Sequence, residues 1–267
     1  MTILQRPGAG ERQSALFERD SIELADELEL ALRLGQVEIR FQPQFAGDGG
    51  RMVGAEALAR WIHPSCGEIG ARELFDLAAK AGLAEDMPRH MLTLAVAEAK
   101  NWPDTLRLSL NVTPKQLLAE GFVARFSSEL AASMLDPKQV TLEITEELLL
   151  GDLDLAARRL KQLRDLGIRI ALDDFGAGFC NFDYLKRLPL DALKLDRSMV
   201  QGIAENERDL AVLRAIVSLA RVLDLDVVAE GIETEEQRLA VVAEGCFSWQ
   251  GFLGSEPLVR EELMQLA

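Results

Sequence analysis

The chain has 267 residues, of which 48% are hydrophobic, so it is long enough to bury a large core. Its formal net charge of −15 argues against non-specific binding to nucleic acids or to anionic membranes, because both need basic patches. Two histidines and three cysteines exclude a histidine-rich metal centre, a disulfide framework and a zinc knuckle.

The ends and the apolar runs of the chain point to a reduced, cytoplasmic protein that does not enter a membrane by itself. Residues 1–17 are polar, lack periodicity and have no signal-peptide core, so they are predicted to form a linker or tail. No apolar run approaches the ~18 residues that a membrane span needs. Any metal would sit among oxygen ligands, which favours Mg²⁺ or Mn²⁺.

After a first helix predicted at 21–34, strands and helices alternate along the chain. Strands are predicted at 38–45, 52–59, 107–112, 140–145, 168–174, 192–197, 226–231 and 246–252. Helices are predicted at 71–81, 87–101, 121–134, 153–166, 206–223 and 235–244. Alternation of this kind predicts an α/β fold with a parallel sheet, and this number of strands favours a closed barrel.

The first two strands are too close in sequence for a parallel crossover. The segment between them, Gly47–Gly50, contains no helix, whereas a parallel connection needs roughly a dozen residues or more. We therefore expect an antiparallel hairpin, and the predicted fold is a TIM-like (βα)8 barrel with an antiparallel first strand.

Polar residues end most of the predicted strands. The segments are EALARW (56–61), LNVTP (110–114), LEITE (142–146), LDDFGAG (172–178), LKLD (193–196), AEGIET (229–234) and QGF (250–252). A barrel brings the carboxyl ends of its strands into one ring, so these residues are expected to form a single site. The number of strand-end carboxylates, with few basic neighbours in sequence, favours a metal centre.

Each residue also has an ordinary structural explanation. Asp173 and Asp174 could cap a helix, and Glu56 or Glu143 could pair with an arginine. Lys194 and Asp196 share one face of a strand and could form an internal salt bridge. Glu233 could belong to the start of a helix at Thr234, where acids favour the helix dipole. Arg60 could be an ordinary surface arginine, and Gln250 could be a buried amide with a backbone partner.

Taken together, these segments resemble the EAL family of cyclic di-GMP phosphodiesterases. The naming triplet is Glu56-Ala57-Leu58, and the resemblance runs from about Phe41 to Pro257. It implies that residues 18–267 form one EAL-type domain that hydrolyses cyclic di-GMP to linear pGpG. It also implies a barrel with two bound divalent ions, Mg²⁺ or Mn²⁺, and inhibition by Ca²⁺.

The resemblance assigns roles residue by residue. It implies Glu56, Asn111, Glu143 and Asp173 as ligands of the first ion, with Asp173, Asp174 and Glu230 at the second. Lys194 resembles the lysine that activates the attacking water, and Glu56 and Glu230 are the further catalytic candidates. Substrate-binding positions match Gln42, Arg60, Glu233 and Gln250. Glu146 matches a residue that anchors the loop after the strand 168–174.

Two segments depart from the family pattern. The loop usually reads DDFG-T/S-GYSS but is DDFGAGFCN here, with Ala177, Phe179, Cys180 and Asn181. The segment 73–82 lacks the usual proline and acid of FIPLAE. Every metal-position residue is kept, so the sequence favours an active enzyme.

The alternatives are a catalytically weak cyclic di-GMP receptor and an unrelated barrel enzyme with a metal–carboxylate site. Loss of Glu56, Asp173 or Lys194 would have favoured the receptor, and all three are present. The resemblance also allows a homodimer through the EAL domain and a GGDEF or sensor domain in a longer protein.

Overall fold

The computed structural model describes residues 21–47, 50–146, 152–178 and 182–267. The chain divides into two compact units: unit 1 is Met1–Arg40 with Leu58–Ala95, and unit 2 is Phe41–Ala57 with Val96–Ala267. The predicted linker at 1–17 and the loop residues Phe179, Cys180 and Asn181 lie outside the described residues. Among the described residues, no helix has both the length and the apolar composition needed to cross a bilayer.

The strands are β1 (Val37–Ala46), β2 (Met52–His63), β3 (Gly67–Ile69), β4 (Arg107–Asn111), β5 (Val140–Thr145), β6 (Arg169–Phe175), β7 (Ala192–Leu195), β8 (Asp226–Ala229) and β9 (Ser248–Trp249). The helices are α2 (Ser21–Arg33), α3 (Ala71–Lys80), α4 (Asp86–Ala99), α5 (Pro114–Leu118), α6 (Phe122–Ser133), α7 (Leu153–Asp165), α8 (Phe182–Arg187), α9 (Glu207–Val222), α10 (Glu235–Glu244) and α11 (Arg260–Leu266).

The strands of unit 2 close into a barrel. Their order is β1-β9-β8-β7-β6-β5-β4-β2, and a further pairing of β1 with β2 joins the two ends. β1 is antiparallel to β9, whereas β2, β4, β5, β6, β7, β8 and β9 run parallel to one another in sequence order. The predicted barrel with an antiparallel first strand is therefore confirmed.

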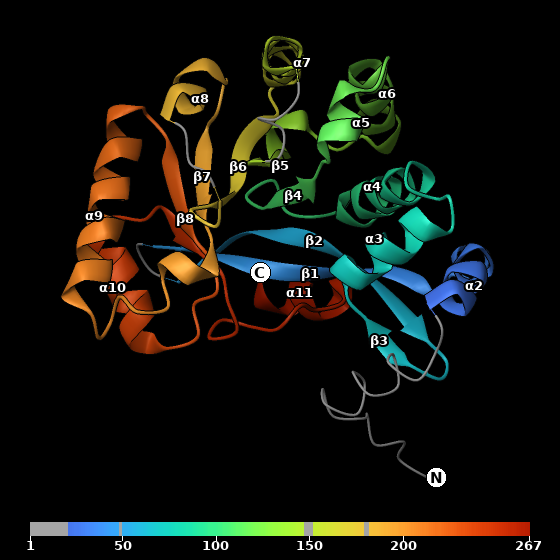
Figure 1. Ribbon diagram of the computed structural model, residues 1–267, viewed down its shortest axis with the longest axis horizontal. Helices are drawn as coiled ribbons and strands as arrows, with labels where there is room; N and C mark the ends of the chain where they lie inside the picture. The colour runs from blue at the N-terminus through green and yellow to red at the C-terminus, as the bar shows by residue number, and fades with distance from the viewer. Residues whose placement is uncertain (1–20, 48–49, 147–151, 179–181) are drawn as a thin grey trace. The chain divides into compact units, whose positions relative to one another are not determined.

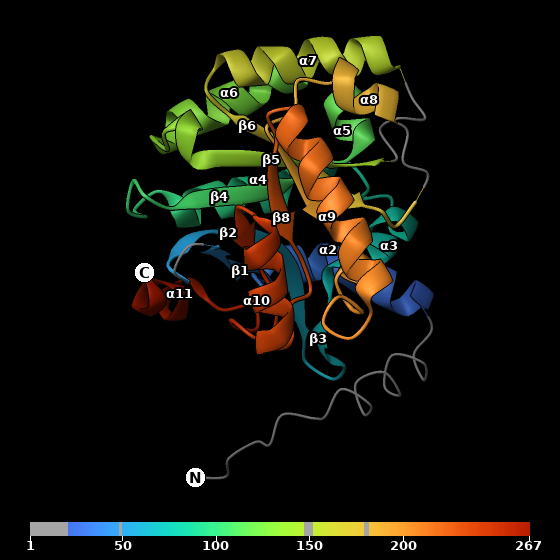
Figure 2. The ribbon, with the colours of Figure 1, turned by 90° about the vertical axis from the view of Figure 1, so that its left-hand side faces the viewer.

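Helices of unit 2 cover the outside of its strands. In Figure 1, α6 and α7 lie beyond β4–β6, and α9 and α10 lie beyond β7 and β8. Figure 2 shows α9 running along β8, against which it packs. The parallel strands contain completely buried apolar residues, among them Leu108, Leu142, Ile170 and Leu193. Such residues are typical of parallel strands covered on both faces.

Helix starts in unit 2 follow local side-chain chemistry. The Thr234 hydroxyl caps α10 by accepting from the Gln237 backbone N–H, and the Gln237 side-chain oxygen accepts from the Thr234 backbone N–H. Asp152 caps α7 by accepting from the Leu155 backbone N–H, and Asn206 caps α9 by accepting from the Arg208 backbone N–H. These side chains satisfy N–H groups that the first helical turn leaves without partners.

Unit 1 contains α2, α3, the hairpin of β2 with β3, and the beginning of α4. α2 packs against α3, and the hairpin pairs Trp61 with Ile69 and His63 with Gly67. His63 Nε2 lies 2.7 Å from Glu27 Oε2, which ties α2 to β2.

Four short elements were not predicted: β3, α5, α8 and α11. Each has at most seven residues, too few for a periodic pattern to emerge. The last predicted strand, 246–252, was too long, because β9 ends at Trp249 and Gln250 follows it.

Candidate active site

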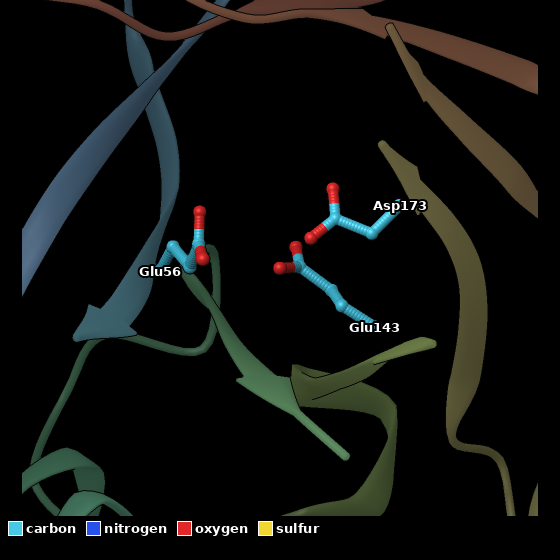
Figure 3. Close-up of side chains that lie close together, drawn as sticks. All are labelled: Glu56, Glu143 and Asp173. Atoms are coloured by element: carbon cyan, nitrogen blue, oxygen red, sulfur yellow. The ribbon is translucent and has the colours of Figure 1, made fainter. Parts of the chain in front are cut away.

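The parallel strands carry the site near their carboxyl ends, except that Glu56 lies within β2, which continues to His63. The register pairs Asn111 of β4 with Glu143 of β5, and Thr145 of β5 with Asp173 of β6. Glu56 extends from β2 and Lys194 from β7, while Glu230 directly follows β8. The predicted convergence of strand-end residues is therefore present, and Figure 3 shows the carboxylates of Glu56, Glu143 and Asp173 pointing toward one another.

Lys194 lies at the centre of this arrangement and is only 1% exposed. Its Nζ is 2.6 Å from Glu143 Oε2 and 2.7 Å from Glu230 Oε1. The same Nζ lies 3.1 Å from Asp173 Oδ1 and 3.2 Å from Glu56 Oε2. A single buried ammonium group thus faces four carboxylates, three from strands β2, β5 and β6 and one, Glu230, from the residue after β8.

The carboxylates form two overlapping groups, each compact enough to hold a cation. One group is Glu56, Glu143 and Asp173, and the other is Asp173, Asp174 and Glu230. In each group, the candidate ligand atoms lie within 4.8 Å of one another. Asp173 belongs to both groups, as expected for a residue that bridges two ions.

Burial and mutual repulsion dominate the electrostatics. Burial raises the pKa of Glu143 well above its usual range despite the attraction of Lys194. Burial likewise raises the pKa of Glu230 to about 8. For Glu56, burial is the largest single influence and raises the pKa, but Lys194 and the hydrogen bonds from Gln250 and Asn111 together lower that pKa below its usual value. Full ionisation of these carboxylates is therefore unfavourable beside a single ammonium group, and a further cation would favour their charged forms.

These residues fit divalent cations of the Mg²⁺ class. The donors are hard oxygens, and Asp173 Oδ1 is buried without a well-aligned hydrogen-bond donor among the described residues. Buried carboxylates are costly unless they are paired or bound to metal, and one lysine cannot pair with all of them. A metal site is the arrangement that satisfies this donor set.

A backbone irregularity brings the two neighbouring aspartates to one site. Adjacent strand residues normally face opposite sides, and we expected the strand to end at these two residues. Instead β6 continues to Phe175, and its register with β7 shifts between Leu172 and Phe175. Asp174 has φ +55°, a left-handed conformation that turns its carboxylate toward the group of Asp173.

The loop root after β6 is fixed from two sides. The Gly176 backbone N–H donates to the carboxylate of Glu146, whose pKa burial nevertheless raises. Gly176 has φ +100°, and a Cβ at this position would lie 2.6 Å from Met199 Sδ. The contact with Glu146 is in keeping with the predicted anchoring role.

Gln250 connects the two carboxylate groups. Its Nε2 donates to Glu56 Oε2 and to Glu230 Oε1, both at 2.9 Å. On the other side of Glu56, Asn111 Nδ2 donates to Oε1 at 2.7 Å. Gln44, which the sequence analysis did not single out, donates to Gln250 Oε1 at 3.0 Å. Its position two residues after Gln42 on β1 was the available signal.

Other predicted residues have partners outside the cluster. Gln42 Nε2 donates to the Ser255 carbonyl at 2.5 Å. Arg60 belongs to unit 1, where its Nε lies 3.2 Å from Glu68 Oε1. Glu233 Oε1 pairs with Arg197 Nη2 at 2.8 Å. The substrate-binding roles of these residues stay predictions.

The suggested salt bridge between Lys194 and Asp196 is wrong. β7 ends at Leu195, so the period of two no longer applies at the next residue. Asp196 instead caps a short 3₁₀ helix, Arg197–Met199, by accepting from the Ser198 backbone.

Comparison with known families decides the membership of this chain. Residues 25–257 match the family described as the EAL domain. The chain belongs to the EAL domain family. As an EAL domain it keeps the acidic residue of its naming triplet at the centre of the site, because Glu56 contacts Lys194, Asn111 and Gln250.

Relatives of this EAL domain include two proteins of Pseudomonas aeruginosa. The bifunctional diguanylate cyclase/cyclic di-GMP phosphodiesterase MucR is 36% identical over 250 residues, covering 92% of this chain and 36% of MucR. The cyclic di-GMP phosphodiesterase NbdA is 33% identical over 269 residues, covering 97% of this chain and 34% of NbdA. The chain thus spans about a third of the length of these relatives.

A solved structure has the same fold. The PaMucR phosphodiesterase in complex with c-di-GMP superimposes with a TM-score of 0.84 at 36% sequence identity. The match covers 90% of this chain and 99% of that one.

Proposed function

We propose that this EAL domain is a metal-dependent phosphodiesterase that hydrolyses cyclic di-GMP to linear pGpG. The observation that carries the proposal is the pair of overlapping carboxylate groups, joined by Asp173, around the buried Lys194. The activity of the relatives MucR and NbdA, as their names state it, agrees with it.

The chain offers a complete donor set for two divalent ions, Mg²⁺ or Mn²⁺. Glu56, Asn111, Glu143 and Asp173 would hold the first ion, and Asp173, Asp174 and Glu230 the second. When bound, such ions lower the pKa of water and offset the charge of the scissile phosphate.

Lys194 supplies a fixed positive charge that no solvent screens, since its side chain is 1% exposed. We assign it the orientation and activation of the attacking water, with Glu56 and Glu230 as further catalytic carboxylates. Water adds to one phosphorus of the cyclic dinucleotide, and one phosphodiester bond breaks. The released ribose oxygen takes up a proton, so one water is consumed for each pGpG.

Substrate contacts are assigned to Gln42, Arg60, Glu233 and Gln250. Arg60 has the fork of donors that suits a phosphate, and its surface partner Glu68 is 37% exposed, so that pairing costs little to exchange. Glu146 is assigned the anchoring of the loop that carries Asp173 and Asp174.

The proposal extends to the protein that contains this chain. We infer that residues 18–267 form the EAL domain, that residues 1–17 are a linker, and that the domain belongs to a larger cytoplasmic regulator with a GGDEF or sensor domain. MucR and NbdA are each about three times as long as the segment that this chain matches, which supports a parent protein with several domains. A homodimer through the EAL domain is an assembly that the family resemblance allows.

One assay tests the function directly. Purified protein is incubated with cyclic di-GMP and Mn²⁺ or Mg²⁺, and the products are resolved by chromatography. Glu56→Ala should lower turnover by about 100-fold or more, since several kcal/mol of charge stabilisation disappear with a ligand. Glu236→Ala, at an exposed position of α10, is the matched control. Binding of cyclic di-GMP without pGpG formation would favour the receptor alternative instead.

A further inference from the structure

We propose that Gln44 is a positioning residue that sets the orientation of the Gln250 amide and thereby couples the two metal groups. The inference deepens the proposed function and rests on it for its catalytic consequence. It stands on a chain of hydrogen bonds from Ser109 through Gln44 and Gln250 to Glu56 and Glu230.

The backbone of Gln250 is already fixed. Its N–H donates to the Ala229 carbonyl at 2.9 Å, and its carbonyl accepts from the Ile232 N–H at 3.1 Å. Gly251 follows, and a Cβ there would lie 2.1 Å from the Ile232 carbonyl oxygen. Only the side-chain torsions of Gln250 remain to be determined.

The two ends of the Gln250 amide are chemically distinct. Glu56 and Glu230 present carboxylate oxygens to it, so the amide must direct its nitrogen at both of them. If the amide were flipped, Gln250 Oε1 would face the carboxylate oxygens of both Glu56 and Glu230. The functional orientation therefore depends on whatever holds the opposite end of the amide.

Gln44 holds that end. Its Nε2 donates to Gln250 Oε1 at 3.0 Å, and the same nitrogen lies 3.4 Å from Ser109 Oγ. The side chains are 8% exposed for Gln44, 6% for Gln250 and 2% for Ser109, so water cannot readily replace these contacts. A donor at Gln44 favours the orientation in which Gln250 donates to both carboxylates.

The position of the Gln250 amide affects the distance between the two carboxylate groups. Glu56 belongs to the first carboxylate group and Glu230 to the second, and Gln250 Nε2 bonds both. Gln44 touches neither carboxylate through a hydrogen bond within the described part of the chain. It therefore acts through Gln250, and its loss should change metal binding and the chemical step more than substrate affinity, to which Gln250 contributes one of the four proposed contacts.

The test is a double-mutant cycle read by Mn²⁺ calorimetry and by turnover. Gln44→Met keeps length and burial but removes the donor, and we expect about 10-fold weaker Mn²⁺ binding, the lower end for residues that orient metal ligands. The kcat should fall by a similar factor, and KM for cyclic di-GMP should change less than kcat, because Gln42, Arg60 and Glu233 keep their proposed substrate contacts. In a Gln250→Ala background the same substitution should have no further effect.

Controls separate this role from general packing. Ser248→Ala alters a buried polar residue of β9 that lines the same 40 Å³ core cavity as Gln44, and should leave Mn²⁺ binding unchanged. Gln44→Ala is the second variant should methionine prevent folding.

Two results would overturn the role of Gln44. The first is unaltered Mn²⁺ affinity in both Gln44 variants, and the second is an undiminished effect of Gln44→Met in the Gln250→Ala background. A third outcome is that the Gln44 variants bind Mn²⁺ more weakly, as expected, but the protein does not hydrolyse cyclic di-GMP. That outcome would overturn the proposed function and leave the positioning role of Gln44 standing.

Discussion

Lys194 Nζ and Glu143 Oε2 lie 2.6 Å apart, and each side chain is 1% exposed. The pair is buried, and three further carboxylates compete for the same ammonium group. Removal of one partner from a buried pair typically costs 3–5 kcal/mol. Lys194 therefore has a structural task beside its proposed catalytic one, and experiments on it must separate the two.

Lys194→Ala should abolish most turnover while leaving much of the affinity for cyclic di-GMP, because the lysine serves the attacking water. Arg60→Ala should weaken substrate binding more than Lys194→Ala does. Calorimetry in Ca²⁺, where hydrolysis is slow, measures both affinities without turnover. The reverse order of affinities would show that the two roles have been exchanged.

Removal of metal should expose the structural task of Lys194. In chelator, Lys194→Ala should lose about 3–5 kcal/mol of unfolding free energy, because its carboxylates keep no cation. Excess Mn²⁺ should restore part of this loss, since ligands that bind only the native state stabilise it. Urea unfolding with and without Mn²⁺ measures both quantities. An equal loss in the two conditions would argue against a metal among these carboxylates.

Ca²⁺ should support substrate binding with little hydrolysis. Its ligand distances of about 2.3–2.6 Å exceed the 2.0–2.1 Å of Mg²⁺, and its geometry is looser. Because Asp173 belongs to both carboxylate groups, the longer ligand distances of Ca²⁺ should hold the two ions too far apart for the reaction. Product chromatography in Ca²⁺ alone, with Mn²⁺ as the reference, measures the effect; full activity would refute the two-ion geometry.

Ala177→Thr should raise turnover or lower the metal concentration that half-saturates the enzyme. Ala177 donates its N–H to the Asp174 carbonyl at 3.1 Å, but its methyl group can form no side-chain bond within this turn. A threonine hydroxyl could add a bond of about 1 kcal/mol, enough to change a loop equilibrium several-fold. Superimposable metal titrations of the two proteins would mean that Glu146 and packing alone hold the loop.

Gly251→Ala should destabilise the fold and displace Gln250. The new Cβ would lie 2.1 Å from the Ile232 carbonyl and 2.3 Å from its nitrogen, which are backbone atoms that cannot rotate away. We expect about 2–3 kcal/mol of lost stability from such overpacking. Gly82→Ala, in open space but at φ +74°, is the control and should cost about 1 kcal/mol. Equal losses in thermal or urea unfolding would contradict the clash.

Part of the site could be read from the sequence because periodic patterns are local. The alternation of apolar strands and helices predicts the barrel, and the polar residue at each strand end predicts Glu56, Glu143, Asp173 and Lys194 as neighbours. The short connection after β1 predicts its reversed direction, since steric limits on crossovers depend only on chain length. Those features follow from residues close together along the chain.

Tertiary structure alone decided which partner each polar group takes. That Lys194 meets four carboxylates depends on strand register, and that Asp174 joins Asp173 depends on the shifted pairing of β6 with β7. The bonds of Gln44 with Gln250 and of Arg197 with Glu233 join residues far apart in sequence. A one-dimensional pattern specifies which face a residue occupies, whereas distances of a few ångströms across a barrel are set only when all its strands have paired.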